Sequence, residues 1–204
     1  MTEGHGKLVG MFGGCHHSEG FVGAAIVACT TFLPRWFRSI KVSTHSSVGF
    51  IYADGYREIF EAREGKSWQG PIPVYKVEDW VARMPKKRRF TMYDIPDCMI
   101  NASMTAMRWN LCYRQLSVWT YSLFQLPRMG LRKWLRFLPI NATYNQVVCS
   151  EAAAIVLDPP CPVLRVAGVS KPDLVTPFLF EKSMIEICAK PTHAVAETRD
   201  AYEN

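Results

Sequence analysis

Short apolar or alternating runs recur along the chain and are typical of β-strands. The predicted strands cover residues 7–12, 48–53, 56–62 and 88–93. Gly13-Gly14 is expected to end the first of them. Asp54-Gly55 separates the second strand from the third, and an Asp-Gly pair between two such runs favours a tight turn. The sequence therefore predicts a β-hairpin over residues 48–62.

Helical patterns occupy most of the remaining chain. The expected helices cover residues 18–32, with Ser18 as N-cap, 77–84, 98–137 with a break at Pro127, and 149–157. Helices and strands are mixed without a repeating strand–helix–strand order, so the predicted fold class is α+β. We expect one domain over residues 1–191, with a helical insertion at 98–138 and a C-terminal tail at 192–204.

Composition limits the classes of partner. The 204 residues are 49% hydrophobic, which suits one compact domain. The net charge of +6 favours anionic partners in general, but the basic clusters at 86–89 and 128–136 contain no recognisable reading motif, so no specific nucleic-acid partner is predicted. The apolar stretch 21–33 is too short to span a bilayer, and polar residues interrupt the stretch 101–126, so no transmembrane segment is predicted.

The cysteines and histidines predict neither disulfides nor a metal. The chain has seven cysteines, an odd number without CxxC spacing, and we interpret them as reduced thiols. No basic segment followed by an apolar run marks a secretory signal, so the expected location as synthesised is the cytoplasm. Cys15-His16-His17 invites a zinc interpretation, but adjacent histidines cannot easily converge on one ion without a partner elsewhere. No metal and no cofactor are predicted.

Cys149 is the residue whose setting best suits chemistry. Polar residues precede it, and three alanines followed by aliphatic residues come after Glu151, so the thiol falls at the N-terminus of the predicted helix. Unpaired amides and the positive end of the helix dipole stabilise a thiolate there. The alternative is that Cys149 is a small buried apolar residue, as free cysteines often are.

Three segments resemble the permuted NlpC-type papain-like proteins, a group that includes the YiiX-like hydrolases and, more distantly, the lecithin:retinol acyltransferase-like enzymes. Leu8-Val-Gly-Met-Phe-Gly-Gly resembles the opening strand of that family. Ser46-Ser-Val-Gly-Phe-Ile, followed by Ile59-Phe-Glu-Ala, resembles its Ser-His-Val-Gly-Ile strand and Ile-Glu-Ala partner strand. Cys149-Ser-Glu resembles the head of its nucleophile helix. The resemblance implies a circularly permuted papain-like fold.

The resemblance also implies a catalytic set. In the family a cysteine is the nucleophile, a histidine at the start of the hairpin is its base, and a polar residue on the next strand orients the histidine. Here Cys149 takes the first role, but Ser47 stands at the position of the base. His45 lies two residues earlier, on the same face and about 6.6 Å away along the strand. A bulge or an earlier strand start would bring His45 into place; otherwise the site has lost its base.

The third group depends on the hairpin register. A two-residue turn would place Glu61 opposite Val48 and facing away from His45, with Glu58 on the shared face instead. A three-residue loop with a bulge would bring Glu61 opposite Gly49. The resemblance favours Glu61, and Glu58 is expected to face solvent. Ser47 and Tyr144 are the candidate substrate-binding residues.

Two functions follow as hypotheses. The first is a thiol hydrolase that cleaves an amide, such as a peptidoglycan-type peptide, through Cys149, His45 and Glu61, with lipid esters as a variant. The second is an inactive papain-like module that binds protein partners, as in a phage particle, where the aromatic stretch 101–134 would supply contact surface. Ser47 in the place of the base favours the second hypothesis.

Overall fold

The computed structural model describes residues 5–18, 43–62, 74–82, 88–121, 146–158, 161–188 and 193–195. These residues form an α+β fold with an antiparallel sheet, which confirms the predicted fold class. None of the helices in these ranges is long and apolar enough to cross a membrane.

The central sheet has six strands in the order β4-β3-β2-β1-β5-β8, and every neighbouring pair is antiparallel. The strands are β1 (Leu8–Ser18), β2 (His45–Tyr52), β3 (Arg57–Phe60), β4 (Val74–Lys76), β5 (Arg88–Asp94) and β8 (His193–Val195). A separate parallel pair joins β6 (Thr120–Tyr121) to β7 (Gln146–Val147). The edge strand β8 lies in the segment that the sequence assigned to the tail.

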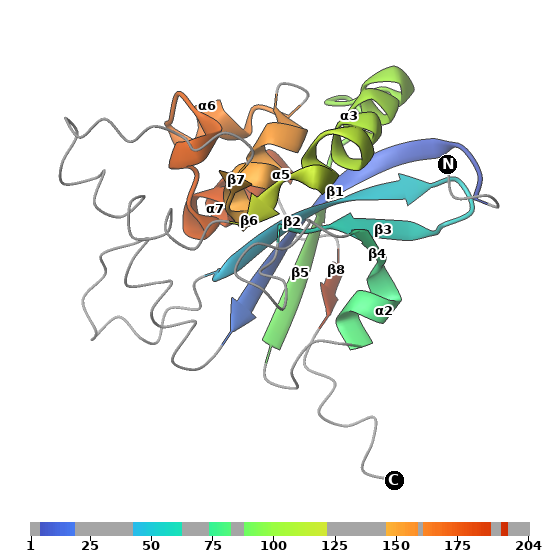
Figure 1. Cartoon of the computed structure of the whole chain (residues 1–204), viewed down its shortest axis with the longest axis horizontal. Coiled ribbons are helices and arrows are strands. Elements are labelled where there is room, and N and C mark those ends of the chain that lie inside the picture. Colours follow the sequence, from blue (N-terminus) through green and yellow to red (C-terminus); the bar gives the residue numbers. More distant parts are fainter. Residues whose placement is uncertain are drawn as a thin grey trace, which may run out of the picture.

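Helices lie on both faces of the sheet, more of them on one face than on the other. They are α2 (Val77–Ala82), α3 (Ala102–Arg114), α5 (Cys149–Leu157), α6 (Val163–Ala167) and α7 (Pro177–Cys188), with 3₁₀ turns η2 (Leu116–Val118) and η3 (Pro172–Leu174). Helices α3, α5, α6 and α7 lie on one side of the sheet, and α2 lies on the other (Figure 1). The main core forms between α5 and the Val48, Phe50 and Phe60 face of the hairpin. A smaller cluster of Phe12, Ile59, Trp80 and Phe90 fills the opposite face.

Strand β1 runs well past the two glycines that were expected to end it. Gly13 and Gly14 are inner strand residues, paired with β2 on one side and β5 on the other. A β-carbon at Gly13 would lie 2.8 Å from the Met184 methyl group. The glycines are therefore places where neighbouring side chains approach the backbone closely, a role that glycine often has in strands.

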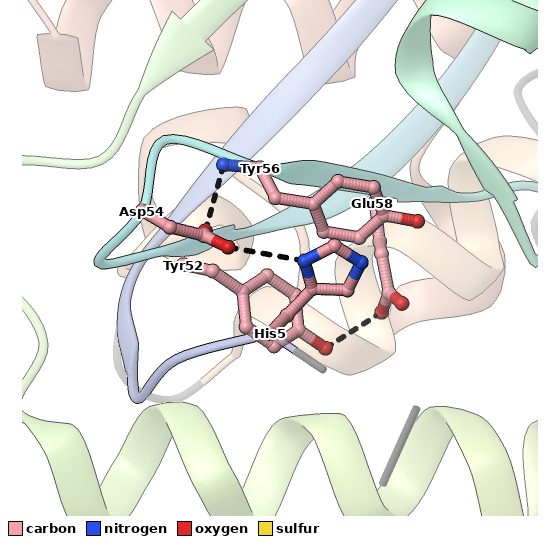
Figure 2. A network of polar contacts seen from close by, with 5 residues as sticks. All are labelled: His5, Tyr52, Asp54, Tyr56 and Glu58. Atoms are coloured by element: carbon pink, nitrogen blue, oxygen red, sulfur yellow. Dashed lines mark hydrogen bonds and ion pairs between the residues drawn. The ribbon is translucent and has the colours of Figure 1, made fainter. Parts of the chain in front are cut away.

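The predicted hairpin is confirmed, with a loop one residue longer than a two-residue turn. The N–H of Tyr52 donates to the Tyr56 carbonyl across three loop residues. Gly55 has a φ of 85°, the left-handed conformation that such loops require at their last position. Asp54 stabilises the loop by accepting hydrogen bonds from the Tyr56 backbone N–H and the His5 ring, at 3.0 Å each (Figure 2).

Glu58 is buried, so the expectation that it faces solvent is wrong. Its side chain points to the side of the main core, and its Oε2 accepts hydrogen bonds from the hydroxyls of Tyr52 and Tyr113, each at 2.9 Å (Figure 2 shows the first). Trp109 in turn donates its indole N–H to the Tyr52 hydroxyl at 3.0 Å. A buried carboxylate needs hydrogen-bond partners, and two phenols from different elements supply them here. The sequence of the strand by itself does not predict these partners.

The helical predictions hold in part. Helices α2 and α5 fall where they were expected. Helix α3 follows its N-cap Asn101, whose Oδ1 accepts from the Met104 N–H, and ends at Arg114. The prediction of helix over residues 98–101 is therefore wrong, as is that over residues 115–121 apart from the η2 turn, since β6 begins at Thr120. Ser18 belongs to β1 rather than capping a helix. The remaining expected helical segments, 19–32 and 122–137, lie outside the described residues.

Candidate functional site

Cys149 is the first residue of α5 and is 2% exposed. The helix start is fixed by its neighbours: Glu151 accepts from the Val148 N–H at 3.3 Å, and the buried Ser150 hydroxyl donates to the Val175 carbonyl at 2.5 Å. The small Ala152 and Ala153 let α5 pack closely on the hairpin face of the core. These contacts place the thiol beside the first residues of β2.

His45 begins β2, three residues before the predicted start of that strand. The Thr44 N–H donates to the His16 carbonyl at 2.7 Å, and the Ser43 hydroxyl donates to the His45 carbonyl at 3.0 Å. Both bonds hold the backbone that leads into the strand. His45 therefore occupies a defined sheet position opposite His16 rather than a free loop.

The Cys149 thiol and the His45 imidazole interact with each other, and each shifts the pKa of the other. Burial alone would raise the pKa of Cys149, but the charge of His45, the bond to its ring and the backbone N–H groups of Ser46 and Ser150 lower it. Burial likewise disfavours the imidazolium, yet the Cys149 thiolate and then Glu61 raise the pKa of His45 to about 10. The environment favours a thiolate–imidazolium pair.

Glu61 completes a chain of three side chains. Its Oε2 lies 3.0 Å from Nε2 of His45, and its side chain is 4% exposed, against 20% for His45. Because Nε2 is engaged by the carboxylate, Nδ1 is the nitrogen left to face the thiol. The carboxylate thus fixes both the orientation of the ring and the atom that carries its outer proton.

The register that brings Glu61 to His45 differs from both predicted registers. Val48 pairs with Phe60 and Phe50 with Glu58, so continuing the pairing by one residue puts Glu61 beside Ser47. Directly opposed residues share a face, and His45 lies on that face two residues before Ser47. The three-residue loop causes this register.

The two candidate substrate-binding residues have different outcomes. Ser47 is 1% exposed, and its hydroxyl lies directly over Gly14. His45, not Ser47, is the side chain that lowers the pKa of the Cys149 thiol. Tyr144 lies outside the described residues.

Comparisons with protein families, curated proteins and solved structures return no match to this chain. The functional argument therefore rests on the geometry of the site.

The other described cysteines lack the setting of Cys149. Burial raises the pKa of Cys15 and Cys112 well above the usual range, and that of Cys161 and Cys188 to about 12 and about 11. Cys98 is exposed, and none of these cysteines is in a disulfide. Among the buried described thiols, a lowered pKa is confined to Cys149.

His16 is a residue that the sequence reading did not bring to this site. Its ring lies edge-on to the His45 ring, with centroids 4.9 Å apart, and it is 2% exposed. Its neighbour His17 points to the opposite face of β1 and lies 2.7 Å from the Glu181 carboxylate. Successive side chains of a strand point to opposite faces, so adjacent histidines are separated in this way. This alternation is the sequence signal that could have predicted different environments for His16 and His17.

Proposed function

We propose that this chain is a thiol-dependent acyl hydrolase with Cys149 as nucleophile, His45 as general acid and base, and Glu61 as the group that orients His45. The observation that carries the proposal is that His45 both lowers the pKa of the Cys149 thiol and lies, through Nε2, 3.0 Å from the Glu61 carboxylate. A nucleophile, a base within hydrogen-bond reach and a third group holding the base are the requirements for covalent catalysis. The proposed architecture is the permuted papain-like one, since the base and its partner precede the nucleophile helix in the chain.

The first half of the reaction forms a thioester. The Cys149 thiolate attacks the carbonyl carbon of an amide or ester, forming a carbon–sulfur bond, and the carbonyl oxygen takes up the negative charge. The thiol heads α5, so the carbonyl oxygen would develop its charge near the helix N-terminus, where the positive end of the helix dipole favours negative charge. When the intermediate collapses, the bond to the leaving nitrogen or oxygen breaks and His45 gives its Nδ1 proton to the leaving group.

The second half restores the enzyme. Neutral His45 takes a proton from water, the hydroxide oxygen attacks the thioester carbon, and the carbon–sulfur bond breaks to release the acid and the thiolate. His45 is again an imidazolium beside a thiolate, as at the start. Glu61 keeps the ring oriented through both proton transfers and stabilises its charged form.

The family resemblance supports a substrate class. It favours an amide in a peptidoglycan-type peptide, with lipid esters as the variant and a phage particle as a setting for such a domain. The same resemblance offered an inactive binding module as the alternative. That alternative depended on Ser47 replacing the base, whereas the interaction of His45 with Cys149 supports the enzyme.

The test is turnover by the wild type, Cys149→Ser and His45→Ala. Muropeptide fragments and a p-nitrophenyl ester serve as amide and ester substrates. We expect both variants to lose at least about a hundredfold in kcat/KM, as expected when a nucleophile or its base is removed.

His5→Ala is the matched control, because His5 forms another 3.0 Å histidine–carboxylate pair, with Asp54, and packs on Tyr52 and Tyr56. This variant is expected to keep wild-type turnover. Equal background rates for wild type, Cys149→Ser and His45→Ala, with all proteins folded, would leave a binding module instead of an enzyme.

A further inference from the structure

Three neighbouring strands bring two histidines and a carboxylate to one point. His16 comes from β1, His45 from β2, and Glu61 follows β3 directly. One ligand atom from each of these residues lies within 4.8 Å of the other two. The central strand carries His45, so this residue belongs both to this cluster and to the thiol site.

The donor set and the spacing fit a zinc-like ion. Two imidazole nitrogens and one carboxylate oxygen are a common three-ligand set for Zn²⁺, with a fourth position left for water. Bonds of about 2.0–2.1 Å in a tetrahedral site place ligand atoms about 3.3 Å apart. The His45 and Glu61 atoms are already 3.0 Å apart, and closing the remaining gaps needs side-chain shifts of about 1 Å or a little more.

The surroundings hold the third ligand in place. The His16 ring packs edge-on against Trp80 at 4.3 Å and is tilted against Phe90 at 5.3 Å, between centroids. Rigid aromatic neighbours lower the entropy that His16 would lose on binding. His45 is the most exposed of the three.

We propose that His16, His45 and Glu61 form a binding site for a divalent transition ion such as Zn²⁺, and that the bound ion inhibits the thiol chemistry. The inhibitory part rests on the proposed function. An ion on Nε2 of His45 replaces the proton shared with Glu61. The ring then carries a proton only on Nδ1, and giving that proton to a leaving group would create an imidazolate, so His45 no longer serves as the acid. Of the segment Cys15-His16-His17, only His16 belongs to the proposed site. His45 and Glu61 are the distant ligands that the zinc interpretation of this segment lacked.

Binding is measured first without activity. In a Cys149→Ser background, which removes the thiolate as a competing ligand, Co²⁺ is titrated and its visible d–d absorption is followed. We expect intense tetrahedral-type bands and saturation at one ion per chain. Adding His16→Asn is expected to weaken Co²⁺ binding at least about tenfold, since one of three protein ligands is lost.

His17→Asn is the matched control, because it removes the adjacent histidine from the other face and leaves the proposed ligands intact. Glu61→Gln is the second variant, so a folding defect in His16→Asn does not decide the result. The site is overturned if Co²⁺ does not bind, or if His17→Asn weakens binding as much as His16→Asn and Glu61→Gln do.

Turnover separates this inference from the proposed function. In wild type, Zn²⁺ is expected to lower the rate and a chelator to restore it, while the rate of His16→Asn stays insensitive to the same Zn²⁺ concentration. Specific Co²⁺ binding with turnover unchanged or raised by Zn²⁺ would overturn the inhibitory role. Turnover retained by Cys149→Ser would refute the thiol mechanism. The Co²⁺ titration would still test the metal site, because it does not depend on turnover.

Discussion

Gly14 lies opposite Ser47 in the sheet, and the Ser47 hydroxyl occupies the space that a β-carbon on Gly14 would need. The Phe90 ring closes the same space from β5, at 2.7 Å from that position. This close approach of β1 to β2 lies two residues from His45. The fit of the strands beneath the base therefore depends on a residue without a side chain.

We expect Gly14→Ala to lower the free energy of unfolding by about 1–3 kcal/mol, because the added methyl group forces Ser47 and Phe90 apart in a closely packed sheet. Gly10→Ala is the control. Its β-carbon would make only ordinary contacts of 3.5–3.9 Å with Ile51, so little loss is expected. Urea unfolding of both variants measures the difference, and equal midpoints would show that the approach at Gly14 is not tight.

Local signals predicted the elements that carry the site. The alanine-rich run after Cys149 was enough to place the thiol at a helix N-terminus, and the Asp-Gly pair was enough to place a hairpin. Both depend on residues within a few positions of each other. The resemblance then brought His45 and Glu61 into consideration as partners of Cys149.

The parts that failed depend on residues far apart in the chain. A difference of one residue in loop length decides which glutamate faces His45, and both predicted registers are displaced by a residue or more from the observed one. Glu58 is buried because Tyr113, 55 residues later, supplies a hydrogen bond. His16 reaches the site through pairing with β2, which no local pattern specifies.

Alkylation distinguishes Cys149 from the other thiols. We expect limited iodoacetamide labelling at about pH 6 to modify Cys149 fastest, because its lowered pKa gives more thiolate than a thiol with an ordinary pKa has there. His45→Ala removes the main positive charge beside the sulfur, so the pKa of Cys149 should rise and labelling at this pH should fall at least about tenfold. Mass-spectrometric mapping identifies the modified residue.

Cys98 is the internal comparison, because it is exposed and is free of a disulfide. Its labelling should be unchanged by His45→Ala. Faster labelling of Cys98 than of Cys149 at this pH, or a Cys149 rate indifferent to His45, would contradict the thiolate–imidazolium pair.

Two negatively charged groups stabilise the charged form of His45. The Cys149 thiolate contributes most to raising the pKa, and the Glu61 carboxylate adds a hydrogen bond and a further charge. Both act against burial, which favours the neutral ring. Removing the charge of Glu61 should therefore lower the pKa of His45 without abolishing the pair.

The pH dependence of kcat/KM tests this reasoning. Wild type should give a bell-shaped profile. The rate should rise with pH as the Cys149–His45 pair loses its first proton, at a pH below the usual pKa of a thiol. It should fall through about pH 10 as His45 loses the proton that it must donate. Glu61→Gln should move the falling limb to lower pH, because the imidazolium has lost a stabilising charge. Glu58→Gln is the matched control, since that carboxylate binds Tyr52 and Tyr113 instead, and its falling limb should coincide with that of wild type. A limb that stays in place in Glu61→Gln, or that moves equally in both variants, would mean that Glu61 has no specific hold on His45.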